Sequence, residues 1–252
     1  MYIKTISDKH AFLRNEITSP LCEVKTSHSV IFAQTSIFAQ ISSPMPRLLL
    51  LLSLRLAQCT AFSFFLLSSA QAQTDSVWYN SVIAWQQEMN REYADSATSP
   101  LTPEDRAIFK GLPFYAPNAD FCVNAVLEIT PNAKPFIMKT SSAKTPTYRQ
   151  YGVFHFKIKG QSFSLPAYQR VEMLTSDEYA DYLFLPFNDL TNGESTYISG
   201  RYMDCRIQKD NLYILDFNKA YNPYCAYNHK YSCPIPPGEN FLNIRIEAGV
   251  LK

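Results

Sequence analysis

The sequence lacks the motifs by which nucleotide-binding and serine-hydrolase sites are usually recognised. Its 252 residues contain no glycine-rich dinucleotide fingerprint, no phosphate-binding loop and no Gly-x-Ser-x-Gly elbow. The formal net charge is only +1, whereas nucleic-acid surfaces and polybasic membrane patches need concentrated positive charge. We therefore expect no nucleotide chemistry and no nucleic-acid partner, and we find no signal for serine-based catalysis.

Residues 45–72 have the parts of a secretory signal peptide. Arg47 supplies the basic start, residues 48–69 form the apolar core, and Ala70-Gln71-Ala72 is a small-residue cleavage site. We predict cleavage near Ala72 and export to the periplasm, the cell envelope or the extracellular space. The mature chain is then expected to contain no transmembrane span.

The N-terminus allows alternative interpretations. An uncleaved membrane anchor is one, but Arg55 interrupts the apolar run, and an arginine at the centre of a membrane helix costs about 2.5–3.5 kcal/mol. Residues 1–44 fit no export pattern. We interpret them either as untranslated sequence, with Met45 as the true start, or as a disordered extension.

Helices are predicted for residues 73–118, ahead of the β domain. Apolar side chains recur every three to four residues over residues 75–95, which is the period of an amphipathic helix. A second, short helix is predicted to follow Thr102, because a capping residue, Pro103 and two acids occur there in succession. Gly111 is a natural stop for this helix.

The remaining residues, 119–252, predict a β domain. Apolar and polar residues alternate over residues 121–129, 154–158 and 242–248, and turn residues separate these runs. No strand–helix alternation follows, so a parallel α/β sheet is not expected. We predict a mostly β (α+β) protein, an antiparallel β-barrel or β-sandwich preceded by one or two N-terminal helices.

Two blocks, residues 186–204 and 215–240, differ from the strands in composition. They are rich in Asp, Asn, Arg and Tyr beyond what a sheet requires, and such groups need hydrogen-bond partners when buried. We predict that the blocks form one polar, tyrosine-rich site at one end of the β domain, with Arg201 against Asp189 or Asp216. The candidate site residues are Asp189, Thr191, Asn192, Arg201, Asp216, Asn218, Tyr221, Asn222, Tyr227, Glu239 and Asn240.

The acids and tyrosines of these blocks allow more than one role. Paired carboxylates perform acid–base chemistry or glycoside hydrolysis when they lie about 5–10 Å apart, and otherwise they cap loops and pair with arginines. The tyrosines suit a sugar or peptide ligand, or else they pack beneath the proline-rich loop. Residues 189–194 also carry oxygen ligands around a glycine turn, which is a weak calcium pattern.

Cys225, His229 and Cys233 are spaced by four residues and have three interpretations, one of which is a cysteine nucleophile paired with His155 or His229. With Cys205 or Cys122 as a fourth ligand they would form a zinc site. Thiols of exported proteins usually oxidise, however, so we favour a Cys225–Cys233 disulfide and expect no metal. The chain-entropy model assigns about 2.5 kcal/mol to a disulfide that closes so short a loop.

The two blocks also carry a long motif. Its members are Phe187, Asp189, Thr191, Gly193, Thr196, Tyr197, Gly200, Arg201 and Tyr202 in the first block, and Asp216, Phe217, Asn218, Ala220, Tyr221, Asn222, Pro223, Cys225, Ala226, Tyr227, Cys233, Pro234, Pro236, Pro237, Glu239 and Asn240 in the second. In this motif the chain resembles a bacterial family catalogued as a domain of unknown function, DUF1684. The resemblance implies a domain over residues 75–252, and it implies no activity.

We therefore expect an exported β-domain protein that acts as a non-catalytic binding or structural module of the cell envelope. A sugar or peptide is the expected ligand class, and no cofactor is expected. The alternative is a hydrolase that uses acidic residues of region 186–240.

We predict that N-terminal sequencing of the protein purified from its native cells will begin at Gln73, free or cyclised, because signal peptidase cleaves after the small-residue site. A cytoplasmic product that retains residues 48–72 would contradict this prediction.

Overall fold

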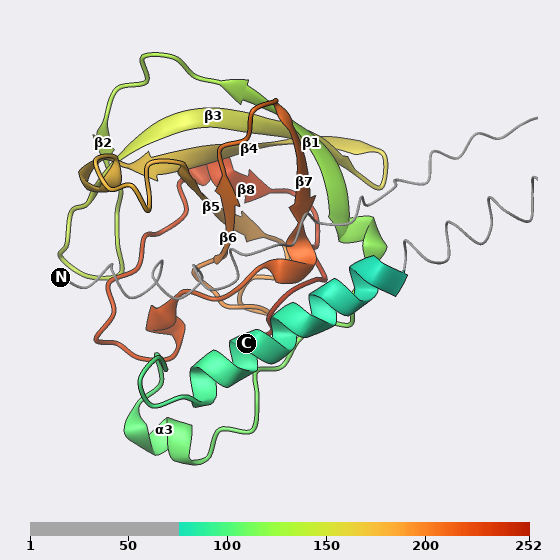
Figure 1. Cartoon of the computed structure of the whole chain (residues 1–252), viewed down its shortest axis with the longest axis vertical. Helices are drawn as coiled ribbons and strands as arrows, with labels where there is room; N and C mark the ends of the chain where they lie inside the picture. The colour runs from blue at the N-terminus through green and yellow to red at the C-terminus, as the bar shows by residue number, and fades with distance from the viewer. Residues whose placement is uncertain (1–75) are drawn as a thin grey trace, which may run out of the picture.

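The computed structural model describes residues 76–252 (Figure 1). The predicted extension of residues 1–44 and the predicted signal peptide of residues 45–72 lie outside the described residues, as does the cleavage site.

The described chain forms one curled sheet of eight strands. Its hydrogen-bonded order is β6-β5-β4-β3-β1-β7, with β2 added on β3 and β8 on β5. Every pairing is antiparallel except that of β5 with β8. The strands are β1 (Cys122–Ile129), β2 (Phe136–Ile137), β3 (Thr147–Ile158), β4 (Gln161–Arg170), β5 (Tyr182–Asp189), β6 (Arg201–Arg206), β7 (Leu212–Asp216) and β8 (Phe241–Leu242).

The sheet is a half-barrel, since its outer strands β6 and β7 do not pair with each other. Figure 1 shows β3 and β4 arching over the space that the other strands enclose. The mostly β, antiparallel fold class predicted from period-two alternation is therefore confirmed, and of the two architectures the barrel is the closer one. Single-turn 3-10 helices connect the strands: η2 (Ala119–Phe121), η3 (Val171–Met173), η4 (Phe217–Lys219), η5 (Tyr224–Ala226) and η6 (Gly238–Asn240).

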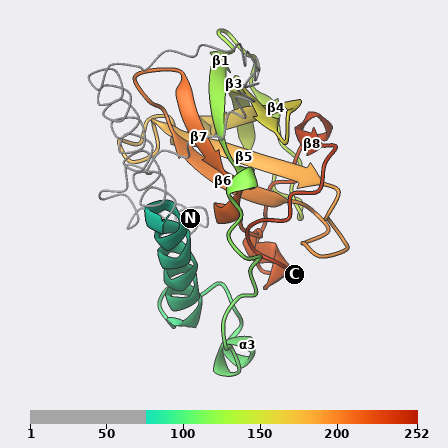
Figure 2. The same cartoon turned by 90° about the vertical axis from the view of Figure 1, so that its right-hand side faces the viewer.

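Within residues 76–252, two helices precede the sheet, as predicted. The first spans residues 76–94, and α3 spans Pro103–Ala107. Thr102 caps α3, because its side-chain oxygen accepts a hydrogen bond from the Asp105 amide at 3.1 Å. In Figures 1 and 2 the long helix lies beside one end of the sheet, and α3 lies farther out. Within residues 76–252 no helix combines the length and the apolar composition that crossing a bilayer requires.

Two apolar clusters fill the molecule. The first lies inside the curled sheet and takes the inward residues of the strands, such as Leu127, Phe154 and Leu185. The second is rich in tyrosine and joins the long helix, through Met89 and Tyr93, to the outer face of the sheet and the 221–233 segment. β4 and β5 each contain five successive buried residues because the two clusters cover both of their faces.

The predicted strand over residues 242–248 is mostly wrong. Only Phe241–Leu242 forms a strand, although Leu242, Ile246 and Ala248 are buried in the expected alternation. Alternation reports which side chains face the core, and it does not report which groups bond the backbone. In residues 246–248 those backbone bonds go to side chains of the first polar block.

Candidate functional site

A fully buried ion pair lies at the centre of the first block. Arg201 is the first residue of β6 and Asp189 is the last of β5, and both side chains are 0% exposed. The Arg201 Nη2 and Asp189 Oδ1 atoms are 3.1 Å apart. Burial lowers the pKa of the Arg201 guanidinium, and the Asp189 carboxylate opposes that effect. The alternative pairing of Arg201 with Asp216 does not form.

The same ion pair bonds the backbone near the C-terminus. Arg201 donates to the carbonyl of Ala248 through Nη1 and to that of Ile246 through Nη2, the latter at 2.9 Å. Asp189 accepts from the Ile246 amide at 2.8 Å. These bonds replace the strand partner that residues 246–248 lack, which is why buried alternation occurs there without a ladder. The guanidinium also lies over the Phe187 ring, 5.2 Å from its centroid.

The turn that follows Asp189 is held by side chains rather than by an ion. The Asp189 carboxylate accepts from the Thr191 amide at 3.2 Å and from the Thr191 hydroxyl at 2.8 Å. Asn192 accepts from the Asp189 amide at 2.7 Å and donates to Thr196 Oγ1 and the Tyr197 carbonyl, both at 3.0 Å. Because donors occupy both carboxylate oxygens, the weak calcium pattern of residues 189–194 has a structural explanation.

Asp216 and Asn218 form a second, separate network. Asp216 accepts from the indole of Trp78 at 3.1 Å and from the side-chain amide of Asn218 at 2.8 Å. Asn218 in turn bonds both the amide and the carbonyl of Asn118, at 2.8 and 2.9 Å. This network fastens the long helix and the segment before β1 to the end of β7.

Glu239 and Asn240 form a third network, on η6. Asn240 donates to the carbonyls of Pro166 and Pro186, at 2.9 and 2.7 Å, and so joins η6 to β4 and β5. The Tyr168 hydroxyl donates to Asn240 at 2.7 Å and to Glu239 at 3.2 Å. Burial, and then the nearby Glu239 carboxylate, raise the pKa of Tyr168.

The tyrosines of the second block are packed into the core. The Tyr221 hydroxyl donates to Asp204 at 2.9 Å, and burial followed by this carboxylate raises the pKa of Tyr221. Asn222 donates to the Leu251 carbonyl at 2.9 Å and to the Tyr227 hydroxyl at 3.2 Å. The Tyr227 ring packs edge-on against Tyr93, with centroids 5.1 Å apart. Their faces therefore contact protein, which leaves little aromatic surface for a ligand.

The two blocks do meet in space, but they do not line one cavity. Tyr202 and Tyr221 exchange backbone hydrogen bonds of 2.9 and 3.0 Å, so the blocks run side by side. Every candidate residue bonds a neighbouring loop or packs in the core. The structure groups them as Asp189, Thr191, Asn192 and Arg201; Asp216 and Asn218; Glu239 and Asn240; and Tyr221, Asn222 and Tyr227.

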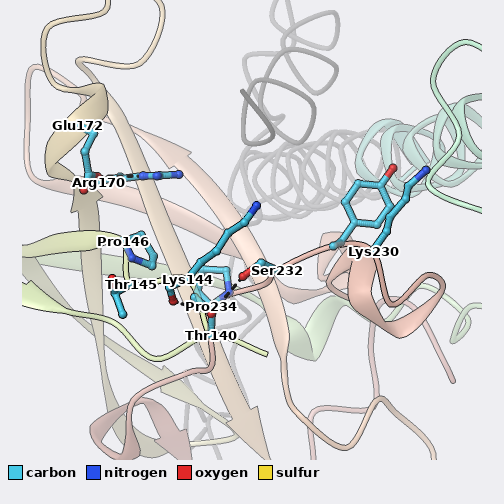
Figure 3. Close-up of a pocket in the computed structure, with 10 residues that line it drawn as sticks. Thr140, Lys144, Thr145, Pro146, Arg170, Glu172, Lys230, Ser232 and Pro234 are labelled. Carbon is cyan, nitrogen blue, oxygen red and sulfur yellow. Dashed lines mark hydrogen bonds and ion pairs between the residues drawn. The ribbon is translucent and has the colours of Figure 1, made fainter. Parts of the chain in front are cut away.

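A cavity of about 300 Å³ lies outside these networks (Figure 3). Three segments that are distant in sequence form its wall: residues 140–146, the end of β4 with η3, and residues 230–234. The lining residues are Thr140, Lys144, Thr145, Pro146, Arg170, Glu172, Lys230, Tyr231, Ser232 and Pro234. No local motif in the sequence joins the three segments, and none of the lining residues is among the candidate site residues, so the sequence did not predict this site.

The cavity wall is predominantly basic. Lys144, Arg170 and Lys230 contribute positive charge, and Glu172 is the one acid among the described lining residues. Partial burial raises the pKa of Glu172, but hydrogen bonds from the Thr147 amide and from Arg170 outweigh it, so this pKa lies below its ordinary value. Glu172 is therefore a carboxylate bound to its own neighbours.

Two free thiols lie directly behind the cavity wall. Cys225 and Cys233 are both buried, and the Cys225 amide donates to the Cys233 sulfur at 3.2 Å. Hydrogen bonding between the thiols lowers the pKa of Cys225 and raises that of Cys233. The predicted disulfide is thus not formed in the structure, although the two residues are neighbours. His229 is exposed, and residues 76–252 contain no cluster of three potential metal ligands, so the zinc interpretation gains no support.

A Ser–His–Glu row lies on the exposed face of the sheet. Ser164 Oγ and Glu128 Oε2 each lie 3.0 Å from a ring nitrogen of His155. Ser164 and His155 are direct cross-strand partners, so strand register accounts for the contact. The side chains of His155 and Glu128 are 45% and 77% exposed, whereas nucleophile activation depends on a water-excluded site. We therefore assign this row to the polar outer face of the sheet.

Comparisons with known proteins identify a similar structure and a family for this chain. The half-barrel resembles the solution NMR structure of the uncharacterised protein from gene locus rrnAC0354 of Haloarcula marismortui, with 31% sequence identity and a TM-score of 0.56, over 71% of this chain and 97% of that chain. The chain belongs to the family described as "Protein of unknown function (DUF1684)", whose model matches residues 107–251. The match starts at the last residue of α3, so the long helix lies outside it. The comparison with curated proteins finds no match.

We predict that Arg201→Ala will lower the free energy of unfolding by about 3–5 kcal/mol, because it leaves the Asp189 carboxylate buried and unpaired. Urea denaturation followed by tryptophan fluorescence measures this loss. Arg245→Ala is the matched control, since Arg245 forms exposed ion pairs with Glu194 and Glu247 and should change stability little. Equal, small effects of both substitutions would contradict a structural role for the buried pair.

Proposed function

We propose that the protein is an exported, non-catalytic binding module of the cell envelope, and that its ligand site is the cavity of Figure 3. Support for a non-catalytic role comes from the acids of the signature blocks. Asp189, Asp216 and Glu239 were the candidates for acid–base chemistry, and each accepts hydrogen bonds in a different network. Glycoside hydrolysis by paired carboxylates needs two such groups converging on one substrate bond.

The architecture of the cavity wall supports a preformed site. Thr140 and Pro234 form an isolated β-bridge, and the Ser141 amide donates to the Cys233 carbonyl at 2.8 Å. On the other side, Arg170 and Glu172 are joined at 2.9 Å. Because backbone and side-chain bonds hold the wall in place, little ordering would be needed when a ligand binds.

The size of the cavity supports a small ligand. About 300 Å³ is at the lower end of the range for small-molecule sites, which suits a single sugar ring or the end of a short peptide. The serine and threonine hydroxyls of the wall are the polar groups that orient ligands of this kind. The volume of the cavity, together with these wall hydroxyls, is the observation on which the proposed function mainly rests.

Export would also change the thiols behind the wall. Oxidising compartments favour disulfides, and the contact between Cys225 and Cys233 would allow one to form with little movement. The bond would fasten the segment that carries Ser232 and Pro234, two residues of the cavity wall.

We predict that Cys225 and Cys233 of the native exported protein will resist thiol labelling after denaturation and will both label once reductant is added. Peptide mapping by mass spectrometry measures this protection. In Cys225→Ser the remaining Cys233 should label without reductant. Labelling of both residues in the unreduced wild-type protein would exclude the disulfide.

We predict that Thr145→Trp will abolish ligand binding by filling the cavity, since Thr145 is exposed at its wall. The measurement is a thermal-shift screen of monosaccharides, sugar acids and di- and tripeptides. Ser162→Trp, on an exposed position of β4, is the matched control and should respond like wild type.

A ligand that stabilises Thr145→Trp as well as wild type would place the site elsewhere. If no compound in the screen stabilises the wild-type protein, the binding proposal fails. Release of a cleavage product from any compound would favour the hydrolase alternative.

A further inference from the structure

We infer that the cavity binds an oxyanion group, a carboxylate or a phosphate, carried by a small polar molecule. The inference rests on the proposed function, because it assigns a ligand class to the same cavity. Three observations support this inference. They are the charges of the wall, the orientation of Arg170, and the hydrogen bonds that fix the hydroxyl groups on the opposite side of the cavity.

The charge balance of the wall favours an anion. Lys144, Arg170 and Lys230 line the cavity, and Glu172 opposes them. Both oxygens of Glu172 are already bonded, Oε1 to the Thr147 amide at 3.0 Å and Oε2 to Arg170 Nε at 2.9 Å. The wall therefore has an excess of positive charge, and its one carboxylate is engaged within the protein.

Arg170 is oriented for recognition. Its Nε is bound to Glu172, which fixes the plane of the guanidinium, and the side chain is 20% exposed. Within residues 76–252 this is its one side-chain hydrogen bond, so both terminal nitrogens can donate to a ligand. Figure 3 shows the guanidinium extending toward the region into which the Lys144 side chain also extends. A planar fork of two donors matches the two oxygens of a carboxylate or phosphate.

The opposite side of the cavity is also held in place. The Ser232 hydroxyl donates to Thr140 Oγ1 at 3.1 Å, and Thr140 Oγ1 donates to the Lys144 carbonyl at 2.8 Å. The Lys230 ammonium lies 5.0 Å from the centroid of the Tyr231 ring. These contacts keep the lysines and hydroxyls near the cavity at a low cost in side-chain ordering.

Two arginines elsewhere on the surface are paired with acids. Arg206 contacts Asp181, and Arg245 contacts Glu194 and Glu247. At the cavity, Glu172 is the one acid among the described lining residues, and both of its oxygens are bonded within the protein. A neutral sugar needs donors and acceptors together, whereas an oxyanion needs donors alone. The wall therefore fits the oxyanion better.

The test uses three probes with the same ring: glucuronate, glucose 6-phosphate and glucose. Each is titrated into the mature exported protein and followed by NMR, at low salt and at high salt. We expect the two anions to bind at least tenfold more tightly than glucose, and high salt to weaken only the anions, because screening acts on charge. Comparing the two anions separates a carboxylate preference from a phosphate preference.

Substitutions locate the bound anion. Lys230→Gln should weaken anion binding about threefold and Lys230→Glu about tenfold or more, since Lys230 is exposed and its removal leaves the fold intact. Arg170→Lys keeps the charge but loses the fork, so it should also weaken binding. Lys157→Glu makes a similar charge change on an exposed position of β3 and should have no effect.

The inference fails if glucose binds as tightly as glucuronate and salt has no effect, and the proposed binding function then stands with a neutral ligand. It also fails if Lys157→Glu and Lys230→Glu weaken binding equally, because the anion would then respond to overall charge. If neither anion binds at millimolar concentration, the anion site does not exist, and the Thr145→Trp screen decides the proposed function independently.

Discussion

The burial of one charged side chain constrains most of this structure. Taking an arginine out of water costs several kcal/mol, and its partners must be provided inside the fold. Here Asp189 supplies the opposite charge, and the carbonyls of Ile246 and Ala248 accept the other donated hydrogens. Residues 246–248 therefore lie in the core without a neighbouring strand, because the side-chain ion pair bonds the amide and carbonyl groups of their backbone. The ion pair between the end of β5 and the start of β6 thus fixes a distant segment.

The same logic gives a physical meaning to the two signature blocks. Asp216 with Asn218 joins the long helix to β7, and Asn240 joins η6 to β4 and β5. Each side chain takes the place of a missing backbone partner in an irregular segment. A half-barrel whose outer strands do not pair needs such bonds to hold its loops, so the blocks specify the fold. The cavity lies outside these networks, although residues 230–234 of its wall belong to the second block.

The sequence predicted mainly those features that depend on residues close to one another along the chain. Alternation correctly predicted β1 and the second half of β3, and the cap at Thr102 correctly predicted α3. The density of polar residues in the two blocks also led to the prediction that Arg201 pairs with an acid of these blocks. Alternation failed over residues 242–248, because burial and backbone bonding are separate properties of a segment. The cavity could not be predicted at all, because Lys144, Arg170 and Lys230 come together only through the pairing of distant segments.

The Cys225–Cys233 pair connects the packed tyrosine cluster with the wall of the cavity. Cys225 belongs to the packed tyrosine cluster, and Cys233 belongs to the segment that forms one wall of the cavity. The backbone at Cys233 is already held in place, because its amide donates to Ser141 Oγ at 3.0 Å on the facing segment. A covalent bond between the thiols would therefore restrict a wall that hydrogen bonds already position, with little change in its shape. Its effect on a ligand would come through preorganisation, which lowers the entropy lost on binding without adding a contact. In the proposed exported state, the redox environment would thus act on binding through the rigidity of the site.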